Sequence, residues 1–324
     1  MHITIGAALL ILAGISFAWS MGAHYTGACV GMPYATGAIR LWPALLLMSV
    51  LTFAGATFAS HRVELAVGIN LIHPRNHQLA IGVAIVGAAF LLTAAFNALR
   101  IPTSTIQILV FSTAGAGFAD GAPVRWITIG HLAILWVIAP VAACGLGYLL
   151  THLMDRLAGR LQKLAPHAAA ITLVVVGAGA SFTMGANDVS NATRVFIMAH
   201  LFSPLIAGLL GGAGLALGVL TWGKPLLKRV AFDIVTMDQN MAAAAQFSQA
   251  LMVMVSVAFG YFTSMNQALV GAMAGTGLAR GRQTIQWKTV NGIVRGWIVG
   301  PFSGLALGFL LTYVALRIRG VLGP

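Results

Sequence analysis

Met184-Gly185-Ala186-Asn187-Asp188-Val189-Ser190-Asn191-Ala192-Thr193-Arg194 gathers a carboxylate, two carboxamides, two hydroxyls and a guanidinium in a short stretch of this chain. Strongly apolar runs flank it, at residues 171–176 and 201–220. An ionisable side chain at the centre of a bilayer costs about 2.5–3.5 kcal/mol on insertion scales, so it usually faces a protein cavity. We therefore expect Asp188 to mark the path of an ion or a substrate.

The composition indicates a membrane protein. Of the 324 residues, 59% are hydrophobic and 7% are charged, whereas a soluble domain carries about 25% charged residues. Apolar segments long enough to cross a hydrocarbon core of about 30 Å recur along the chain. Lipid offers no partner to backbone N–H and C=O groups, and the alternation of a membrane barrel is absent, so the crossings are expected to be helices. We predict an all-α polytopic protein of the plasma (inner) membrane, in contact with lipid.

The net charge of +12 does not indicate a nucleic-acid partner. The 18 Lys and Arg residues stand singly at the ends of apolar runs, where snorkelling and the positive-inside bias place them. A basic stripe with interleaved aromatic residues, typical of nucleic-acid binding, is missing. The two cysteines, Cys29 and Cys144, lack metal-ligand spacing. No nucleic acid and no resident cofactor are expected.

The second half of the chain repeats the first. Met21-Gly22-Ala23 recurs 163 residues later as Met184-Gly185-Ala186. Five polar and glycine positions recur 160 residues apart: Ser104, Gln107, Gly115, Gly117 and Gly121 match Ser264, Gln267, Gly275, Gly277 and Gly281. Such a register indicates a duplication. We predict a first transmembrane repeat in residues 1–150, a cytoplasmic linker in 151–167 and a second repeat in 168–324.

Basic residues predict how the halves are oriented. The segment 120–125 carries one basic residue, whereas 280–288 and the linker 151–167 carry three each. If the basic segments are cytoplasmic, the halves are inverted and both termini lie outside, although Arg317 and Arg319 argue against this. Inverted repeats with interrupted helices at matching positions point to a secondary transporter. Four such interruptions are expected, at 21–38, 102–121, 185–200 and 261–281, as broken helices and re-entrant helical hairpins.

Two of the interruptions carry donors suited to an anion. Pro102 is followed by three hydroxyl residues, and the second half supplies equivalent groups; together these are Thr103, Ser104, Thr105, Ser264 and Asn266. Half-helix N-termini offer free N–H groups and the positive end of the helix dipole. We predict that these residues bind an oxyanion, with ordinary helix capping as the alternative.

The stretch around Asp188 suits a cation. Asp188, Asn187 and Asn191 supply oxygen ligands for one or two Na⁺, or a proton is carried by Asp188 or by His24. Asn187 and Asn191 are also counted as substrate-binding candidates. Arg194 either contacts the anion, pairs with Asp188 or snorkels toward the membrane surface, and the sequence leaves these three roles open.

Gly185-Ala186-Asn187-Asp188-Val189-Ser190-Asn191-Ala192 resembles the GANDVANA signature of the inorganic phosphate transporter (PiT) family. Pro102-Thr103-Ser104-Thr105-Ile106-Gln107 resembles the P-x-S-T-T-H hairpin of that family, and Thr221-Trp222-Gly223-Lys224 also matches it. The resemblance covers essentially the whole chain. It implies a PiT-like fold of two inverted repeats, usually a homodimer, and uptake of a tetrahedral oxyanion driven by a cation gradient.

The chain departs from that pattern in its first half. Where the family repeats GAND, this chain has Gly22-Ala23-His24-Tyr25-Thr26, without a carboxylate. This motif, continuing to Ile39, resembles the sulfate-permease (CysP-type) branch of the family. Phosphate near neutral pH keeps a proton that it can donate to a carboxylate, whereas sulfate only accepts hydrogen bonds. The donors His24, Tyr25 and Thr26 therefore favour sulfate, because mispaired buried polar groups discriminate strongly.

The sequence thus predicts a secondary active transporter that imports sulfate by symport with H⁺ or Na⁺. In this hypothesis the anion lies between half-helix N-termini of the two repeats and is released by alternating access. The alternatives are a sodium- or proton-coupled phosphate symporter and an anion channel lined by the glycine-rich segments. An enzyme is not expected, because motifs such as H-E-x-x-H and G-x-S-x-G are missing.

Overall fold

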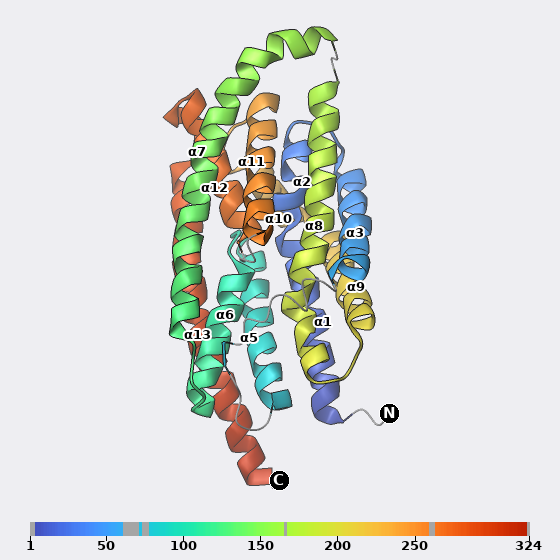
Figure 1. The fold of residues 1–324 in the computed structure, drawn as a ribbon, viewed down its shortest axis with the longest axis vertical. Helices are drawn as coiled ribbons and strands as arrows, with labels where there is room; N and C mark the ends of the chain where they lie inside the picture. Colours follow the sequence, from blue (N-terminus) through green and yellow to red (C-terminus); the bar gives the residue numbers. More distant parts are fainter. Residues whose placement is uncertain (1–3, 61–70, 73–77, 165–166, 259–262, 323–324) are drawn as a thin grey trace.

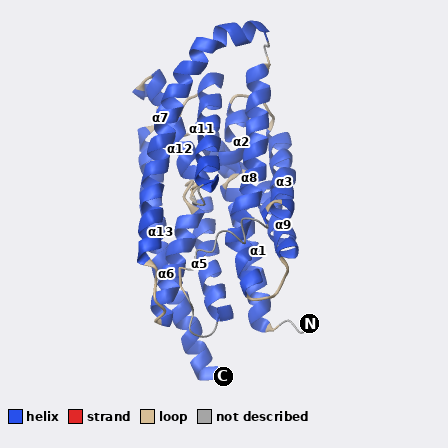
Figure 2. Cartoon of the chain, in the orientation of Figure 1, coloured by secondary structure: helices blue, strands red, loops and turns tan. Residues whose placement is uncertain are grey.

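The fold is known from a computed structural model that describes residues 4–60, 71–72, 78–164, 167–258 and 263–322. These residues form α-helices joined by short loops, with one 3₁₀ turn, η1 (Arg282–Thr284), and one isolated β-bridge (Figure 2). The α-helices are α1 (Ile5–His24), α2 (Thr26–Ala35), α3 (Leu41–Phe58), α5 (Gln78–Ala98), α6 (Thr105–Asp120), α7 (Trp126–Leu164), α8 (Ala168–Met198), α9 (Pro204–Trp222), α10 (Lys224–Phe232), α11 (Gln239–Ala258), α12 (Met265–Arg280) and α13 (Trp287–Leu322).

The long helices lie side by side in one elongated bundle (Figure 1). Seven segments of the described chain are helical, long and apolar enough to cross a membrane. Large apolar side chains such as Ile127 and Phe302 are exposed on the outside of the bundle, as expected where lipid is the solvent. The predicted all-α polytopic membrane fold is therefore confirmed. Both ends of the described chain lie at the same end of the bundle (Figure 1).

Helices α6 and α12, which begin in the two expected hairpins, are too short to cross the bilayer. α6 and α12 have 16 residues each, which gives a length of about 24 Å at 1.5 Å per residue, less than a hydrocarbon core of about 30 Å. Each begins at a serine whose hydroxyl accepts a hydrogen bond from a backbone N–H of the first turn, at Ser104 and Ser264. Each is packed against the longest helix of the other half, α6 against α13 and α12 against α7. This is the arrangement expected of the two re-entrant hairpins.

The two signature motifs differ in their backbone. The first departs from a regular helix at one residue, Tyr25, between the end of α1 at His24 and the start of α2 at Thr26. Tyr25 keeps right-handed helical dihedral angles, and Ile5–Ala35 forms one membrane span. The second shows no such departure: α8 continues to Met198 through the expected interruption at 185–200. Its polar side chains return to the helix instead, since the Ser190 hydroxyl donates to the carbonyl of Asn187, and the segment contains no proline.

The expected linker is also mostly helical. Residues 151–164 continue α7 without a break, and residues 165–166 lie outside the described part of the chain. The end of α7, the start of α8 and η1 lie at one end of the bundle, while the turn between α6 and α7 lies at the opposite end (Figure 1). The segments 151–164 and 280–288, which carry the excess of basic residues, are thus separated from 120–125 by the length of the bundle.

Glycines bring the helices of the two halves into close contact, and the contacts recur with the repeat. A Cβ atom at Gly22 of α1 would overlap the carbonyl oxygen of Leu215 in α9, and one at Gly185 of α8 would overlap that of Thr52 in α3. The glycines and their partners are each 163 residues apart. The same holds for a second pair of contacts, Gly55 with Phe182 and Gly218 with Trp19. Helices α1 and α8 run in opposite directions (Figure 1).

We expect Gly22→Ala and Gly185→Ala each to destabilise the protein by about 1–3 kcal/mol, because the backbones must separate to admit a methyl group. Gly87→Ala is the matched control: it lies within α5, where a Cβ atom meets nothing within 4 Å. Thermal unfolding of the purified protein in detergent measures the effect. Equal melting temperatures for Gly22→Ala and Gly87→Ala would contradict the tight packing of α1 on α9.

Candidate functional site

The N-termini of the two short helices meet inside the bundle. The Ser104 hydroxyl accepts from the N–H of Gln107 at 3.3 Å, and Ser264 caps Gln267 in the same way at 3.4 Å. The side chains of these two glutamines contact each other, with Gln107 Nε2 donating to Gln267 Oε1 at 3.4 Å. Asn266 Nδ2 donates to the carbonyl of Thr103 at 3.0 Å. Residues from the two halves thus form one buried polar junction.

The first signature motif contacts the first short helix. The Tyr25 hydroxyl and the Thr105 hydroxyl are 2.7 Å apart. His24 lies beside Thr103, the residue before the helix cap: its Nε2 is 3.0 Å from the Thr103 nitrogen and 3.1 Å from the Thr103 oxygen. Both His24 and Tyr25 are 1% exposed. The connection between α1 and α2 therefore places His24 and Tyr25 directly on the start of α6.

Thr26, the third donor of this motif, faces elsewhere. Its hydroxyl is 2.9 Å from the carbonyl of Ala23 and 2.8 Å from that of Gly223. A hydroxyl has one proton to donate, and in Thr26 that proton is directed to these two carbonyl oxygens. Thr26 fastens the start of α2 to the junction between α9 and α10, and it makes no hydrogen bond with the hairpin residues described above.

The second signature motif approaches the first from the other half. Asp188 is partly exposed, and Asn191 Nδ2 donates to its Oδ1 at 3.4 Å. Helix α8, which carries Asp188, packs against α1 and α2. The Asp188 carboxyl group lies within electrostatic range of Tyr25, the residue that occupies its own position in the first half, since 188 − 163 = 25. Asn187, one residue earlier, is also partly exposed.

Arg194 lies further along α8, six residues beyond Asp188. It is partly buried and it interacts with neighbouring groups. Its place on the same helix as Asp188 keeps its predicted roles open. The described residues contain no group of three His, Cys, Asp or Glu side chains that would hold a metal ion.

The sequence did not single out Asn97, which completes the junction. Its Oδ1 lies 2.6 Å from His24 Nδ1, and its Nδ2 donates to the carbonyl of Ser20 at 2.8 Å. The one sequence feature that could have identified Asn97 is that it is a lone carboxamide at the end of the apolar helix α5. Gln107 was recognised only as a departure from a motif; its Oε1 is buried without a hydrogen-bond partner in the described structure.

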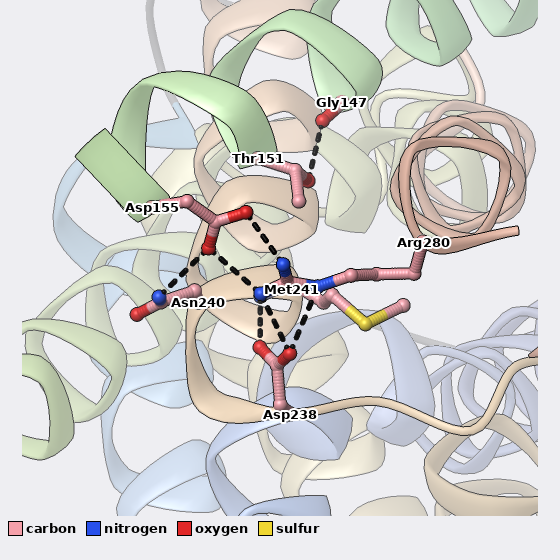
Figure 3. Close-up of polar contacts among 7 residues, drawn as sticks. All are labelled: Gly147, Thr151, Asp155, Asp238, Asn240, Met241 and Arg280. Carbon is pink, nitrogen blue, oxygen red and sulfur yellow. Dashed lines mark hydrogen bonds and ion pairs between the residues drawn. The ribbon is translucent and has the colours of Figure 1, made fainter. Parts of the chain in front are cut away.

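A separate ion-pair cluster joins the helices α7, α11 and α12 (Figure 3). Arg280, the last residue of α12, binds both carboxylate oxygens of Asp155 in α7, at 2.6 and 2.7 Å. It also binds Asp238 at 2.8 Å, just before α11, and Asn240 donates to Asp155 at 3.0 Å. These residues are partly exposed, and exposed ion pairs contribute about 0–1 kcal/mol each. The cluster fixes the C-terminal end of α12, away from the capped N-terminus.

The fold and this junction define a class of protein. Two half-length helices from different halves of a chain, meeting at their N-termini inside a bundle of membrane-spanning helices, are characteristic of secondary transporters. The chain belongs to the phosphate transporter family, whose model matches residues 21–308. The predicted family is thereby confirmed, and the chain is an anion transporter of the membrane and not an enzyme.

Known relatives extend over most of the chain. A sulfate permease, CysP of Bacillus subtilis, is 29% identical over 317 residues, covering 95% of this chain and 87% of the permease. A putative phosphate permease of Methanocaldococcus jannaschii is 24% identical over 293 residues, covering 90% of this chain and 92% of its own. The solved structure of a sodium-dependent phosphate transporter superposes with a TM-score of 0.84, at 20% identity, covering 98% of this chain and all of that one. This last likeness confirms the PiT-like fold.

Proposed function

We propose that this protein imports sulfate by symport with a cation, H⁺ or Na⁺, through alternating access. The observation that carries the proposal is the contact between the Tyr25 and Thr105 hydroxyls, 2.7 Å apart. The position equivalent to Asp188 thus offers a hydroxyl at the start of α6 where a carboxylate would offer only acceptors. The sulfate permease among the relatives is in keeping with this choice.

The anion is held, on this proposal, between the N-termini of α6 and α12. Free N–H groups of a first helical turn and the helix dipole favour a negative charge. In this proposal Thr103, Ser104, Thr105, Ser264 and Asn266 surround the anion. The side-chain hydrogen bonds of Ser104, Ser264 and Asn266 involve only neutral side chains and backbone groups. A dianion without a proton of its own meets donors there and no opposing carboxylate.

Asp188 binds the driving cation on this proposal. It brings a carboxylate to within electrostatic range of the first signature motif. With Asn187 and Asn191 it supplies oxygen atoms for Na⁺, or it carries a single proton. Arg194, on the same helix, is proposed as a further contact of the anion.

The two halves, residues 1–150 and 168–324, act as inverted repeats in this proposal. Corresponding helices run in opposite directions, α1 against α8 and α7 against α13 (Figure 1). Rocking of such repeats about a central site exposes the site alternately to each side. Both termini are proposed to lie outside, with the basic segments 151–167 and 280–288 in the cytoplasm. A homodimer is proposed from the family resemblance alone.

Phosphate is the second candidate substrate. The putative phosphate permease of M. jannaschii is 24% identical to this chain, and the superposed structure is that of a sodium-dependent phosphate transporter. Uptake of labelled sulfate into proteoliposomes, with sulfate and phosphate as competitors, distinguishes the two. Sodium and pH gradients are imposed separately to identify the driving ion.

We expect saturable uptake that accumulates sulfate against its gradient. Excess unlabelled sulfate should block it, whereas phosphate at the same concentration should not. Stronger inhibition by phosphate than by sulfate would establish the alternative. Uptake that only dissipates the sulfate gradient, whichever ion gradient is imposed, would identify a channel.

We expect Ser104→Ala and Ser264→Ala each to raise the apparent KM for sulfate about three- to tenfold. Loss of a cap costs about 0.5–2 kcal/mol and loosens the first turn that faces the anion. Ser203→Ala is the matched control, since Ser203 caps α9 at an exposed position, 3.5 Å from the N–H of Ile206. The KM of each variant in proteoliposomes measures the effect. If the KM for sulfate is unchanged in both Ser104→Ala and Ser264→Ala, the anion does not bind at this junction.

A further inference from the structure

The two nitrogens of His24 have different surroundings. Nδ1 lies 2.6 Å from Asn97 Oδ1, and the orientation of that amide is fixed because its Nδ2 donates to the carbonyl of Ser20. An amide oxygen only accepts hydrogen bonds, so Nδ1 must carry a proton. The remaining nitrogen, Nε2, is therefore the one that gains or loses a proton when the imidazole changes its charge.

Nε2 faces a donor and an acceptor of the same residue. It lies 3.0 Å from the nitrogen and 3.1 Å from the oxygen of Thr103. The Thr103 hydroxyl, 3.3 Å away, can donate to a neutral ring or accept from a protonated one. A neutral ring accepts from the N–H and opposes its lone pair to the carbonyl oxygen. A protonated ring donates to the carbonyl oxygen and opposes its proton to the N–H. Each charge state satisfies one of these two contacts at the expense of the other, so the hydrogen bonds by themselves do not fix the charge of the ring.

The residue that Nε2 contacts belongs to the anion junction. Thr103 precedes the cap of α6, and its carbonyl also accepts from Asn266, next to the cap of α12. Protonation of His24 would free the N–H of Thr103 and add a positive charge beside the N-terminus of α6. Both changes favour a dianion there.

We propose that His24 is a positioning residue that makes sulfate binding depend on pH: when Nε2 gains a proton it moves its hydrogen bond from the N–H to the C=O of Thr103, and sulfate binds more tightly. The inference rests on the proposed function. Histidine changes its charge between about pH 5 and 8. By linkage, bound sulfate raises the affinity of His24 for the proton by the same factor.

The groups around His24 leave this role to the imidazole. Helix α1 packs against α2, α5, α8, α9 and α10. Neither α5 nor α9 contains a titratable side chain in its range. The titratable or charged side chains of the other three are Cys29, Tyr34, Asp188, Arg194, Lys224, Lys228 and Arg229. Among titratable groups of the described residues, the one with a recorded contact to His24 is Tyr25, edge to face at 5.8 Å between ring centres.

The test is equilibrium binding of radiolabelled sulfate to the purified full-length protein, without gradients, between pH 5.5 and 8.5. We expect the wild-type Kd to fall by at least about fivefold from high to low pH, the lower range of coupling between linked sites. His24→Gln retains a polar group at Thr103 but cannot take up a charge, so its Kd should vary less than twofold. His131→Gln, at an exposed position of α7, should keep the wild-type dependence.

A second variant keeps the test decisive if His24→Gln does not fold. Asn97→Asp places a carboxylate against Nδ1, which favours the charged ring, so the change in Kd should move to higher pH by about one unit or more. An unchanged pH profile in Asn97→Asp, or wild-type pH dependence in His24→Gln, would overturn the inference and leave sulfate transport intact. If the wild type binds no sulfate at any pH, the proposed function fails together with it.

Discussion

Proteoliposomes containing Asp188→Asn are expected to exchange sulfate across the membrane but to accumulate less than about a tenth of the wild-type amount. Asp188 is the carboxylate of α8, a helix that packs against the first signature motif in α1 and α2. Asparagine preserves its shape and a hydrogen bond to Asn191, yet it carries no charge and releases no proton. The anion site at the helix N-termini should remain, so binding and exchange persist. The driving ion loses its ligand, and coupling is lost.

Two assays on the same preparation separate coupling from binding. Counterflow, in which internal unlabelled sulfate draws in label, requires only the anion site, whereas net accumulation requires the cation as well. Asp233→Asn is the matched control, because Asp233 is exposed and pairs only with Arg229 at 3.1 Å on α10 among the described residues. If Asp188→Asn accumulates sulfate as the wild type does, Asp188 has no role in coupling. Loss of both counterflow and accumulation would place Asp188 in the anion site.

Asp188 and His24 have separable roles in these expectations. Asp188 is partly exposed, which suits a residue that exchanges an ion during the cycle. His24 is 1% exposed and bound by protein at both nitrogens, which suits a residue that adjusts affinity. If Na⁺ is the driving ion, Asp188→Asn should therefore keep the pH dependence of sulfate binding, whereas His24→Gln should lose it.

The sequence predicted the elements whose signals are local. Ser104 and Ser264 were expected at helix N-termini because a hydroxyl follows a turn and precedes an apolar helix, and both cap α6 and α12. The recurrence at 160 and 163 residues predicted a duplication, and Gly22 and Gly185, which belong to that recurrence, make matching contacts. Composition alone gave the helical membrane class, since lipid leaves the backbone few other choices.

Contacts between distant residues could not be predicted in this way. His24 and Thr103 are 79 residues apart in the sequence, and Arg280 and Asp155 are 125 residues apart. The local sequence around each of these residues does not indicate which distant residue it contacts. The interruption expected at 185–200 was wrong because glycine and small polar residues permit a break without requiring one. In α8 the hydroxyls of Ser190 and Thr193 bond to carbonyls of their own helix, and the helix continues.

Tyr25→Asp is expected to weaken sulfate binding by about a hundredfold and to admit phosphate. The substitution gives the first half the carboxylate that the second half has at Asp188. It removes the hydroxyl contact with Thr105 and sets an acceptor against an anion that also only accepts, and a buried group left unsatisfied costs about 1–3 kcal/mol, more when it is charged. Hydrogen phosphate escapes this penalty, because it has a proton to donate to the new carboxylate.

Two further variants separate the effect of charge from that of the lost hydroxyl. Tyr25→Phe keeps the ring and removes the contact at 2.7 Å, so it should weaken sulfate severalfold without any gain in phosphate binding. The double variant His24→Asn, Tyr25→Asp makes the first motif match Asn187 and Asp188 and should bind phosphate best. The Kd values of both anions, measured on purified protein, give the ratio directly. If Tyr25→Asp still prefers sulfate, selectivity does not arise at the first signature motif, and Arg194 becomes the residue to test.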